Sequence, residues 1–270
     1  TFDHRYHHWL DLDDAQRRRI ALIDTSRSMT PSVAEFAVAM TLNLLRDIPD
    51  AVARMRAGTW DSDARYTHPR PGGFVFGDLA GRRVGLAGFG TINRCYAECV
   101  SGFGPQLTAY DPFVADAVLA ARKIERAASL VELAARSEVF VVGIPPTPAT
   151  EGIVSRAVLG ALPKGALLVL VTRMQVVDQA ALWERVQAGE LRAAVDVFDP
   201  EPPKADAWFR RHENVLPTPH IAGGAFFCHA RCFTTACRDV EAVLAGREPA
   251  YAASVRDARL YRGEAKSVKP

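Results

Sequence analysis

The sequence predicts an α/β protein built on a doubly wound parallel sheet. From residue 82 onward, short apolar segments alternate with helical stretches, which is typical of parallel strands joined by crossover helices. The strands are expected at 82–87, 106–110, 138–143, 166–171, 192–196 and 214–217, and the helices at 91–102, 129–135, 155–161, 178–188 and 224–246. A glycine-rich turn follows the first of these strands, and polar residues follow several later ones. In such a sheet, ligands bind beyond the C-terminal ends of the strands.

The segment before the sheet is expected to contain a short strand at 20–23 and then a long helix over 31–57. Thr30 as a cap, Pro31 in the first turn and Glu35 near the positive end of the helix dipole predict where this helix begins. Its apolar residues cover much of the helix circumference, so we expect it to be buried on several sides. A connection rich in glycine and proline over 58–77 leads to the sheet.

Composition and charge exclude several classes of protein. The chain has 270 residues, 49% of them hydrophobic, which is enough for a substantial core. A net charge of +2, from 33 basic and 31 acidic residues, argues against nucleic acid or an anionic membrane as the main partner. No apolar run approaches the roughly 20 residues needed to span a bilayer, and no secretory signal pattern opens the chain. We therefore expect neither a nucleic-acid nor a membrane partner.

The cysteines and histidines do not indicate a metal site. The five cysteines show no CxxC spacing and are typical of small buried side chains in a reducing compartment, so a cytoplasmic location is expected. His4, His7 and His8 cluster near the start of the chain, but no carboxylate or cysteine has a ligand spacing to them. No metal is expected.

The glycine-rich turn Gly88-Phe-Gly-Thr-Ile-Asn93 has the features of a dinucleotide phosphate site. The first glycine allows a tight strand-to-helix turn, the second lets a pyrophosphate approach the backbone, and the helix N-terminus offers N–H groups to the anion. Asp111 comes 23 residues after Gly88, where its carboxylate can hold ribose hydroxyls. The residues expected to bind the cofactor here are Gly88, Phe89, Gly90, Thr91, Ile92, Asp111 and Pro112.

Three polar residues after later strands are candidates for catalysis. Arg173 ends the most apolar strand, where its guanidinium suits a substrate carboxylate or forms an ordinary strand-end salt bridge. His220 lies between a proline and a run of small residues, and is either a general acid/base or a solvated loop residue. Glu201, between two prolines, either orients the imidazole and favours its protonated form or is a solvated loop residue.

Further residues at strand ends are expected on the cofactor side of the site. Asp196 follows a strand of small residues and could face a cofactor amide. Pro145 and Thr147 follow another strand and could line the adenosine side, although a rigid proline turn explains them equally. Thr172 and Gly223 are also expected to bind the cofactor.

The chain resembles the D-isomer-specific 2-hydroxyacid dehydrogenase family. The similarity runs in order from about residue 20 to 245, so it covers most of the chain. The segments that carry it are Val33–Ala37, Gly58–Trp60, Leu79–Gly85, the glycine turn, Tyr110–Pro112, Pro145–Pro148, Leu162–Leu168, Arg173 with Val177-Asp178, Ala194–Pro202 and Thr218–Gly223.

The resemblance implies a catalytic trio, a cofactor and a domain plan. In this family the arginine binds the substrate carboxylate and carbonyl, the histidine transfers the hydroxyl proton and the glutamate supports it, which assigns these roles to Arg173, His220 and Glu201. NAD is implied as cofactor, because the carboxylate of Asp111 would repel a 2′-phosphate. The expected organisation is a remnant of a flavodoxin-like substrate domain at 1–27, a Rossmann NAD-binding domain at 28–222, and a C-terminal helix with a tail at 223–270.

The first 27 residues are too few for the family's whole substrate domain. We therefore expect either that further residues precede them or that the chain is a truncated member. The family also implies a homodimer in contact through the segment from Pro31 to Trp60.

Four positions depart from the family pattern. Asn93 replaces the third glycine of the turn, and Gly143 replaces a common histidine. Leu170 replaces an asparagine, and Met174 replaces the glycine after Arg173, where its side chain could crowd the pocket. Two functions follow from the resemblance: an NAD-dependent enzyme that interconverts a 2-oxo acid and a D-2-hydroxy acid, or a non-catalytic NAD-binding regulator on the same fold.

Overall fold

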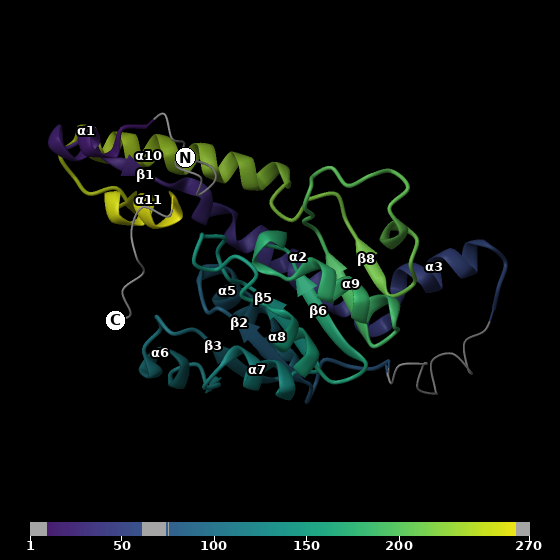
Figure 1. Ribbon diagram of the computed structural model, residues 1–270. Helices are drawn as coiled ribbons and strands as arrows, with labels where there is room; N and C mark the ends of the chain where they lie inside the picture. Colours follow the sequence, from purple (N-terminus) through teal and green to yellow (C-terminus); the bar gives the residue numbers. More distant parts are fainter. Residues whose placement is uncertain (1–9, 61–73, 75, 263–270) are drawn as a thin grey trace.

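A parallel sheet of seven strands forms the centre of the protein (Figure 1). The computed structural model describes residues 10–60, 74 and 76–262. The strand order is β4-β3-β2-β5-β6-β7-β8, and every neighbouring pair is parallel. The order reverses between β2 and β5, so the topological switch point lies beside the glycine turn. The bounds are β2 (Arg83–Ala87), β3 (Gln106–Tyr110), β4 (Glu125–Arg126), β5 (Val139–Val142), β6 (Ala166–Leu170), β7 (Leu191–Val195) and β8 (Val215–Pro217).

The doubly wound sheet expected from the sequence is confirmed. Each of the six expected strands is present, with its ends within one residue of the expected ones. The edge strand β4 was not expected, because it has only two residues, both exposed and charged. A strand this short has no apolar period that could reveal it.

Helices cover both faces of the sheet and bury both sets of alternating side chains (Figure 1). Val141 and Val169 pack on the face that carries α2 (Thr30–Arg46) and α5 (Thr91–Val100). Their neighbours Val142 and Leu170 pack on the opposite face. That face carries α7 (Leu130–Arg136), α8 (Arg156–Ala161) and α9 (Gln179–Gln187). Burial on both faces explains why the central strands are continuous apolar runs.

The single helix expected over 31–57 is instead two helices, α2 and α3 (Ile48–Arg56). Asp47 separates them in a left-handed conformation, with φ 51°. Its carboxylate forms a buried ion pair with Arg192 of β7, which also donates a hydrogen bond of 3.0 Å to the Leu44 carbonyl. The break therefore depends on a residue of the sheet far away in sequence, and a helical pattern read locally does not reveal it.

The two ends of the described chain meet in a small unit beside the sheet (Figure 1). Strand β1 (Leu22–Ile23) pairs antiparallel with β9 (Ala252–Ala253), and the 3₁₀ helix η1 (Thr25–Met29) packs against α10 (Phe226–Leu244). The remaining elements are α1 (Leu12–Arg17), η2 (Ser101–Phe103), α6 (Asp116–Ala120), η3 (Met174–Val176), η4 (Trp208–Arg210) and α11 (Val255–Arg262).

No helix in the described part of the chain is long and apolar enough to cross a membrane. Within the same residues, no three histidine, cysteine or acidic side chains are grouped as a metal site would require. The histidine cluster His4, His7 and His8 lies outside the described residues.

Candidate active site

His220 and Glu201 form a hydrogen-bonded pair in the loops after β8 and β7. His220 Nδ1 lies 2.8 Å from Glu201 Oε2, and the Phe198 N–H donates to Glu201 Oε1 at 2.8 Å. The side chains of His220 and Glu201 are 38% and 35% exposed, so the pair is reachable from solvent. Because β7 and β8 are adjacent and parallel, their C-terminal loops begin side by side, and this brings together two residues 19 positions apart.

The surroundings of Glu201 favour its ionised form. Burial raises the pKa of its carboxyl group, but the Phe198 N–H, the His220 ring and the positive charge of Arg173 together hold that pKa below its ordinary value of 4.5. The carboxylate is therefore negative at neutral pH, so in its contact with His220 Nδ1 it is the hydrogen-bond acceptor. The effect of Arg173 on this pKa also places its guanidinium in the same electrostatic environment as the pair.

Asp196 holds the loop that carries His220. Its side chain is fully buried; Oδ1 accepts hydrogen bonds from the Thr218 hydroxyl at 2.6 Å and the Ile221 N–H at 3.0 Å, and Oδ2 accepts from the Ala222 N–H at 2.9 Å. These bonds bracket His220, whose φ of 53° is uncommon for a residue other than glycine. The expected contact of Asp196 with a cofactor amide stays a prediction, and fixing this loop is a role that the sequence did not reveal.

Arg173 follows β6 at the C-terminal edge of the sheet, and its Nη1 donates to the Thr172 carbonyl at 2.7 Å. The Thr172 hydroxyl donates to the Val142 carbonyl at 3.1 Å, which ties the ends of β6 and β5 together. The expectation that Met174 could crowd the pocket is wrong, because the residue is 1% exposed and packs in the core on the face of the sheet that carries α7, α8 and α9. Leu170 is likewise buried in that core.

The glycine turn has the room and the free donors that a phosphate needs. Gly88 has φ +80°, and a Cβ on it would come within 3.1 Å of the Gly143 backbone. A Cβ on Gly90 would meet nothing within 4 Å, and no side chain caps α5, which begins at Thr91. Asp111 Oδ2 accepts a hydrogen bond from the Phe89 N–H at 2.8 Å. This open, uncapped helix N-terminus beside a carboxylate fits the diphosphate and ribose of a dinucleotide.

Two of the departures from the family pattern, Asn93 and Gly143, compensate for each other sterically. Asn93 is fully buried, and its Nδ2 donates to the Gly88 carbonyl at 2.7 Å, so its amide supports the turn. A Cβ at position 143 would lie 2.4 Å from Asn93 Nδ2 and 2.5 Å from its Cγ. Asparagine can therefore occupy position 93 because residue 143 has no side chain.

The other expected cofactor residues lie in loops around the same edge, except Ile92, which lies in the first turn of α5. The Thr150 hydroxyl donates to the Pro145 carbonyl at 2.6 Å and accepts from the Thr147 N–H at 2.8 Å, which closes the turn after β5. Pro112 and Ile92 are both partly buried, and Ile92 packs against the core. A Cβ on Gly223 would touch Met29 Sδ at 3.4 Å.

Thr30 has a different role from the one expected. It is the first residue of α2 rather than its cap, and its hydroxyl donates to the Thr91 hydroxyl at 3.2 Å. Phe198 was also absent from the sequence-based site, because its contribution is a backbone N–H that no side-chain pattern reveals.

Comparison with known proteins identifies the family. The model of the D-isomer specific 2-hydroxyacid dehydrogenase NAD-binding domain matches residues 38–222. The chain is 33% identical over 238 residues to D-3-phosphoglycerate dehydrogenase of Mycobacterium tuberculosis, covering 88% of this chain and 43% of the relative. It is 31% identical over 224 residues to the enzyme of that name from Rattus norvegicus, covering 83% of this chain and 40% of the relative. The chain thus spans less than half the length of these relatives.

Solved structures show the same fold. A 2-hydroxyacid dehydrogenase from Ketogulonicigenium vulgare superposes with a TM-score of 0.76 at 29% identity, over 90% of this chain and 74% of that one. The apo D-mandelate dehydrogenase of Rhodotorula graminis gives 0.79 at 26% identity, over 92% and 72%. With a family match over more than half of its length, the chain belongs to the D-isomer-specific 2-hydroxyacid dehydrogenases, whose NAD-binding domain it carries and whose cofactor is NAD.

Proposed function

We propose that the protein is an NAD(H)-dependent oxidoreductase that interconverts a 2-oxo acid and the corresponding D-2-hydroxy acid. One observation carries the proposal: the hydrogen-bonded pair of His220 and Glu201 lies close enough to Arg173 for its charge to lower the pKa of Glu201. Reduction of a 2-oxo acid requires a cation that binds its carboxylate and a proton donor for its carbonyl oxygen, and both groups lie at one edge of the sheet.

His220 acts as the general acid and base. Because its Nδ1 faces Glu201, the substrate meets Nε2. In reduction, the protonated imidazole donates from Nε2 to the carbonyl oxygen of the 2-oxo acid; in oxidation, neutral Nε2 takes the proton of the hydroxyl group. The ionised carboxylate of Glu201 accepts a hydrogen bond from Nδ1 and so holds the ring in orientation.

Arg173 binds the substrate carboxylate and orients the carbonyl carbon. Its guanidinium is always charged and can form two parallel hydrogen bonds with a carboxylate. The glycine turn and Asp111 would hold NAD, and the bound cofactor supplies or accepts the hydride. Asp196 keeps His220 in place through the loop that its carboxylate organises.

The test is NADH oxidation with a panel of 2-oxo acids: glyoxylate, hydroxypyruvate, pyruvate and bulkier members. D-3-phosphoglycerate is added in the oxidation direction, because relatives carry that name. His220→Ala should lower kcat by about 10²–10⁴-fold, and Arg173→Ala should mainly raise KM. His229→Ala, which removes an exposed histidine from α10, is the matched control and should leave turnover unchanged. NADH binding without turnover on any acid would instead support the non-catalytic regulator.

We also propose that the protein is a cytoplasmic homodimer in contact through α3. Ile48, Val52 and Met55 are exposed on one face of this helix, and the nearby Trp60 is exposed as well. The described cysteines are all free thiols, as in a reducing compartment. Light scattering should give a dimer for the wild type and a monomer for Met55→Asp. A monomeric wild type would contradict the dimer proposal.

A further inference from the structure

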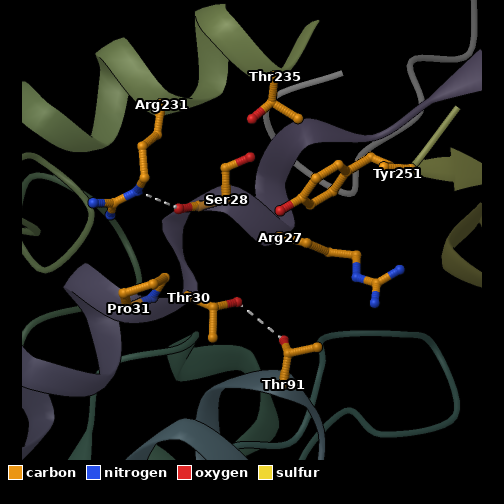
Figure 2. A pocket seen from close by; sticks show the side chains of 9 residues that line it. Arg27, Ser28, Thr30, Pro31, Thr91, Arg231, Thr235 and Tyr251 are labelled. Carbon is orange, nitrogen blue, oxygen red and sulfur yellow. Dashed lines mark hydrogen bonds between the residues drawn. The ribbon is translucent and has the colours of Figure 1, made fainter. Parts of the chain in front are cut away.

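A pocket of about 490 Å³ lies between η1, the N-terminus of α5 and α10 (Figure 2). The residues that define its chemistry are Arg27, Ser28, Thr30, Thr91, Arg231 and Tyr251. Two arginines and several hydroxyl groups line it, and none of the described residues that line it is acidic. Thr91 begins α5, so the pocket opens directly onto the helix N-terminus of the glycine turn. This lining suits a negatively charged ligand rich in acceptor oxygens.

Of the two arginines that line the pocket, Arg27 has the guanidinium that a ligand can reach. Its guanidinium lies 5.8 Å from the centre of the Tyr251 ring, and within the described residues no carboxylate pairs with it. Figure 2 shows its side chain extending from η1 toward the side of the pocket where Thr91 lies. The exposed guanidinium can therefore reach an anion at the end of α5 without first breaking an ion pair.

The wall behind Arg27 is built by a buried carboxylate. Asp239 of α10 is 3% exposed; its Oδ2 accepts a hydrogen bond from the Tyr251 N–H at 2.8 Å and its Oδ1 accepts from the Ala250 N–H at 2.9 Å. These bonds fix the segment that carries Tyr251, and the ring of Tyr251 in turn supports Arg27 by a cation–π contact.

Arg231 stabilises the wall of the pocket through hydrogen bonds within the protein. Its Nε donates to the Ser28 carbonyl at 3.2 Å (Figure 2). Its Nη2 donates to the Ser32 hydroxyl at 2.9 Å, and together the two bonds tie α10 to η1 and α2. The Ser28 side chain is buried, with the residue 4% exposed. Apart from a weak interaction with the Cys232 thiol, its hydroxyl has no hydrogen-bond partner in the described chain. A buried hydroxyl with no oxygen or nitrogen partner costs free energy unless a ligand supplies one.

We propose that Arg27 binds the diphosphate of NAD from the side opposite the glycine turn. The inference rests on the NAD site described above and adds a residue to it from outside the stretch that matches the NAD-binding domain, residues 38–222. The N–H groups of α5 and the linked hydroxyls of Thr91 and Thr30 would face one side of the diphosphate, and the guanidinium the other. Cofactor binding would thereby join η1 and α10 to the sheet domain.

The test is the dissociation constant of NADH, measured by fluorescence or calorimetry on the full chain. Arg27→Gln should raise this constant by about 10–100-fold, because a charge-assisted contact with phosphate is lost. The effect should shrink at high salt, since the site is exposed. Arg27→Lys should keep part of the affinity. Arg211→Gln, which removes an exposed arginine elsewhere and changes the net charge equally, is the matched control and should bind like the wild type.

Ligand fragments show which part of the cofactor Arg27 contacts. Arg27→Gln should weaken the binding of ADP and ADP-ribose but not of adenosine. Unchanged NADH affinity in Arg27→Gln, or an equal loss with adenosine, would overturn the assignment. If the wild type binds no NADH at all, the cofactor site itself is refuted. If the wild type binds NADH and Arg27→Gln binds it equally well, only the role of Arg27 is refuted.

Discussion

Replacement of Gly143 by alanine should destabilise the protein through a clash with Asn93. The added Cβ would lie 2.4 Å from Asn93 Nδ2 and 2.7 Å from Oδ1. Asn93 is fully buried and donates to the Gly88 carbonyl at 2.7 Å, so its amide cannot move without losing that bond. Overpacking costs about 1–3 kcal/mol, and the lost hydrogen bond adds about 1 kcal/mol. We expect Gly143→Ala to lower the free energy of unfolding by about 3 kcal/mol.

The magnitude should depend on Asn93. In an Asn93→Gly background the clash and the hydrogen bond are both already absent. Gly143→Ala should then be neutral or stabilise by about 0.4–1 kcal/mol, through the reduced entropy of the unfolded chain. A double-mutant cycle should therefore give a coupling energy of about 3 kcal/mol, which is large for two contacting residues.

Urea denaturation followed by circular dichroism measures all four proteins of the cycle. Gly160→Ala is the control: this exposed glycine lies in α8, and a Cβ there would meet nothing within 4 Å, so alanine should stabilise by about 0.5–1 kcal/mol. NADH affinity should fall in Gly143→Ala, because Asn93 supports the carbonyl of the glycine turn. If Gly143→Ala lowers stability equally with asparagine and with glycine at position 93, a clash with the Asn93 side chain is not the cause.

Three further predictions follow from the active-site geometry. Met174→Ala should lower the free energy of unfolding by about 2–5 kcal/mol and leave KM nearly unchanged, since Met174 fills the core; a large gain in substrate range without loss of stability would contradict this. Asp196→Asn should destabilise the protein by about 1–3 kcal/mol and reduce kcat, because an amide NH₂ would face N–H donors of the His220 loop. Urea melts measure the stability and steady-state kinetics measure kcat. The control Asp206→Asn, at an exposed position, should leave both unchanged. The pKa of Glu201 is lowered on folding, so its contribution to stability is complete above a pH of about 4.5 and is lost as pH falls through the folded pKa. In urea melts, Glu201→Gln should therefore be less stable than the wild type at neutral pH and equally stable in acid. A loss of stability that is independent of pH would contradict the assignment.

The residues of the candidate active site differ in how far the sequence could reveal them. Arg173, Glu201 and His220 could be proposed from the sequence because each lies in a polar segment that follows a strand, and ligands bind at that edge of a parallel sheet. The pairing of His220 with Glu201 is seen in the structure, and their catalytic roles stay predictions. The loop-fixing role of Asp196 was not found, because its partners are backbone N–H groups, which every residue except proline carries.

The sequence by itself determined the sheet and the place of the cofactor turn. Apolar period, strand length and glycine spacing are local properties, so six strands and the turn at Gly88 could be read from short stretches of the chain. Only the tertiary structure decided the break at Asp47, the burial of Met174, the fit of Asn93 against Gly143 and the pocket around Arg27. Each of these depends on side chains or backbone brought together from distant segments. A local pattern cannot report such contacts, because close packing in the folded core determines which distant residues meet.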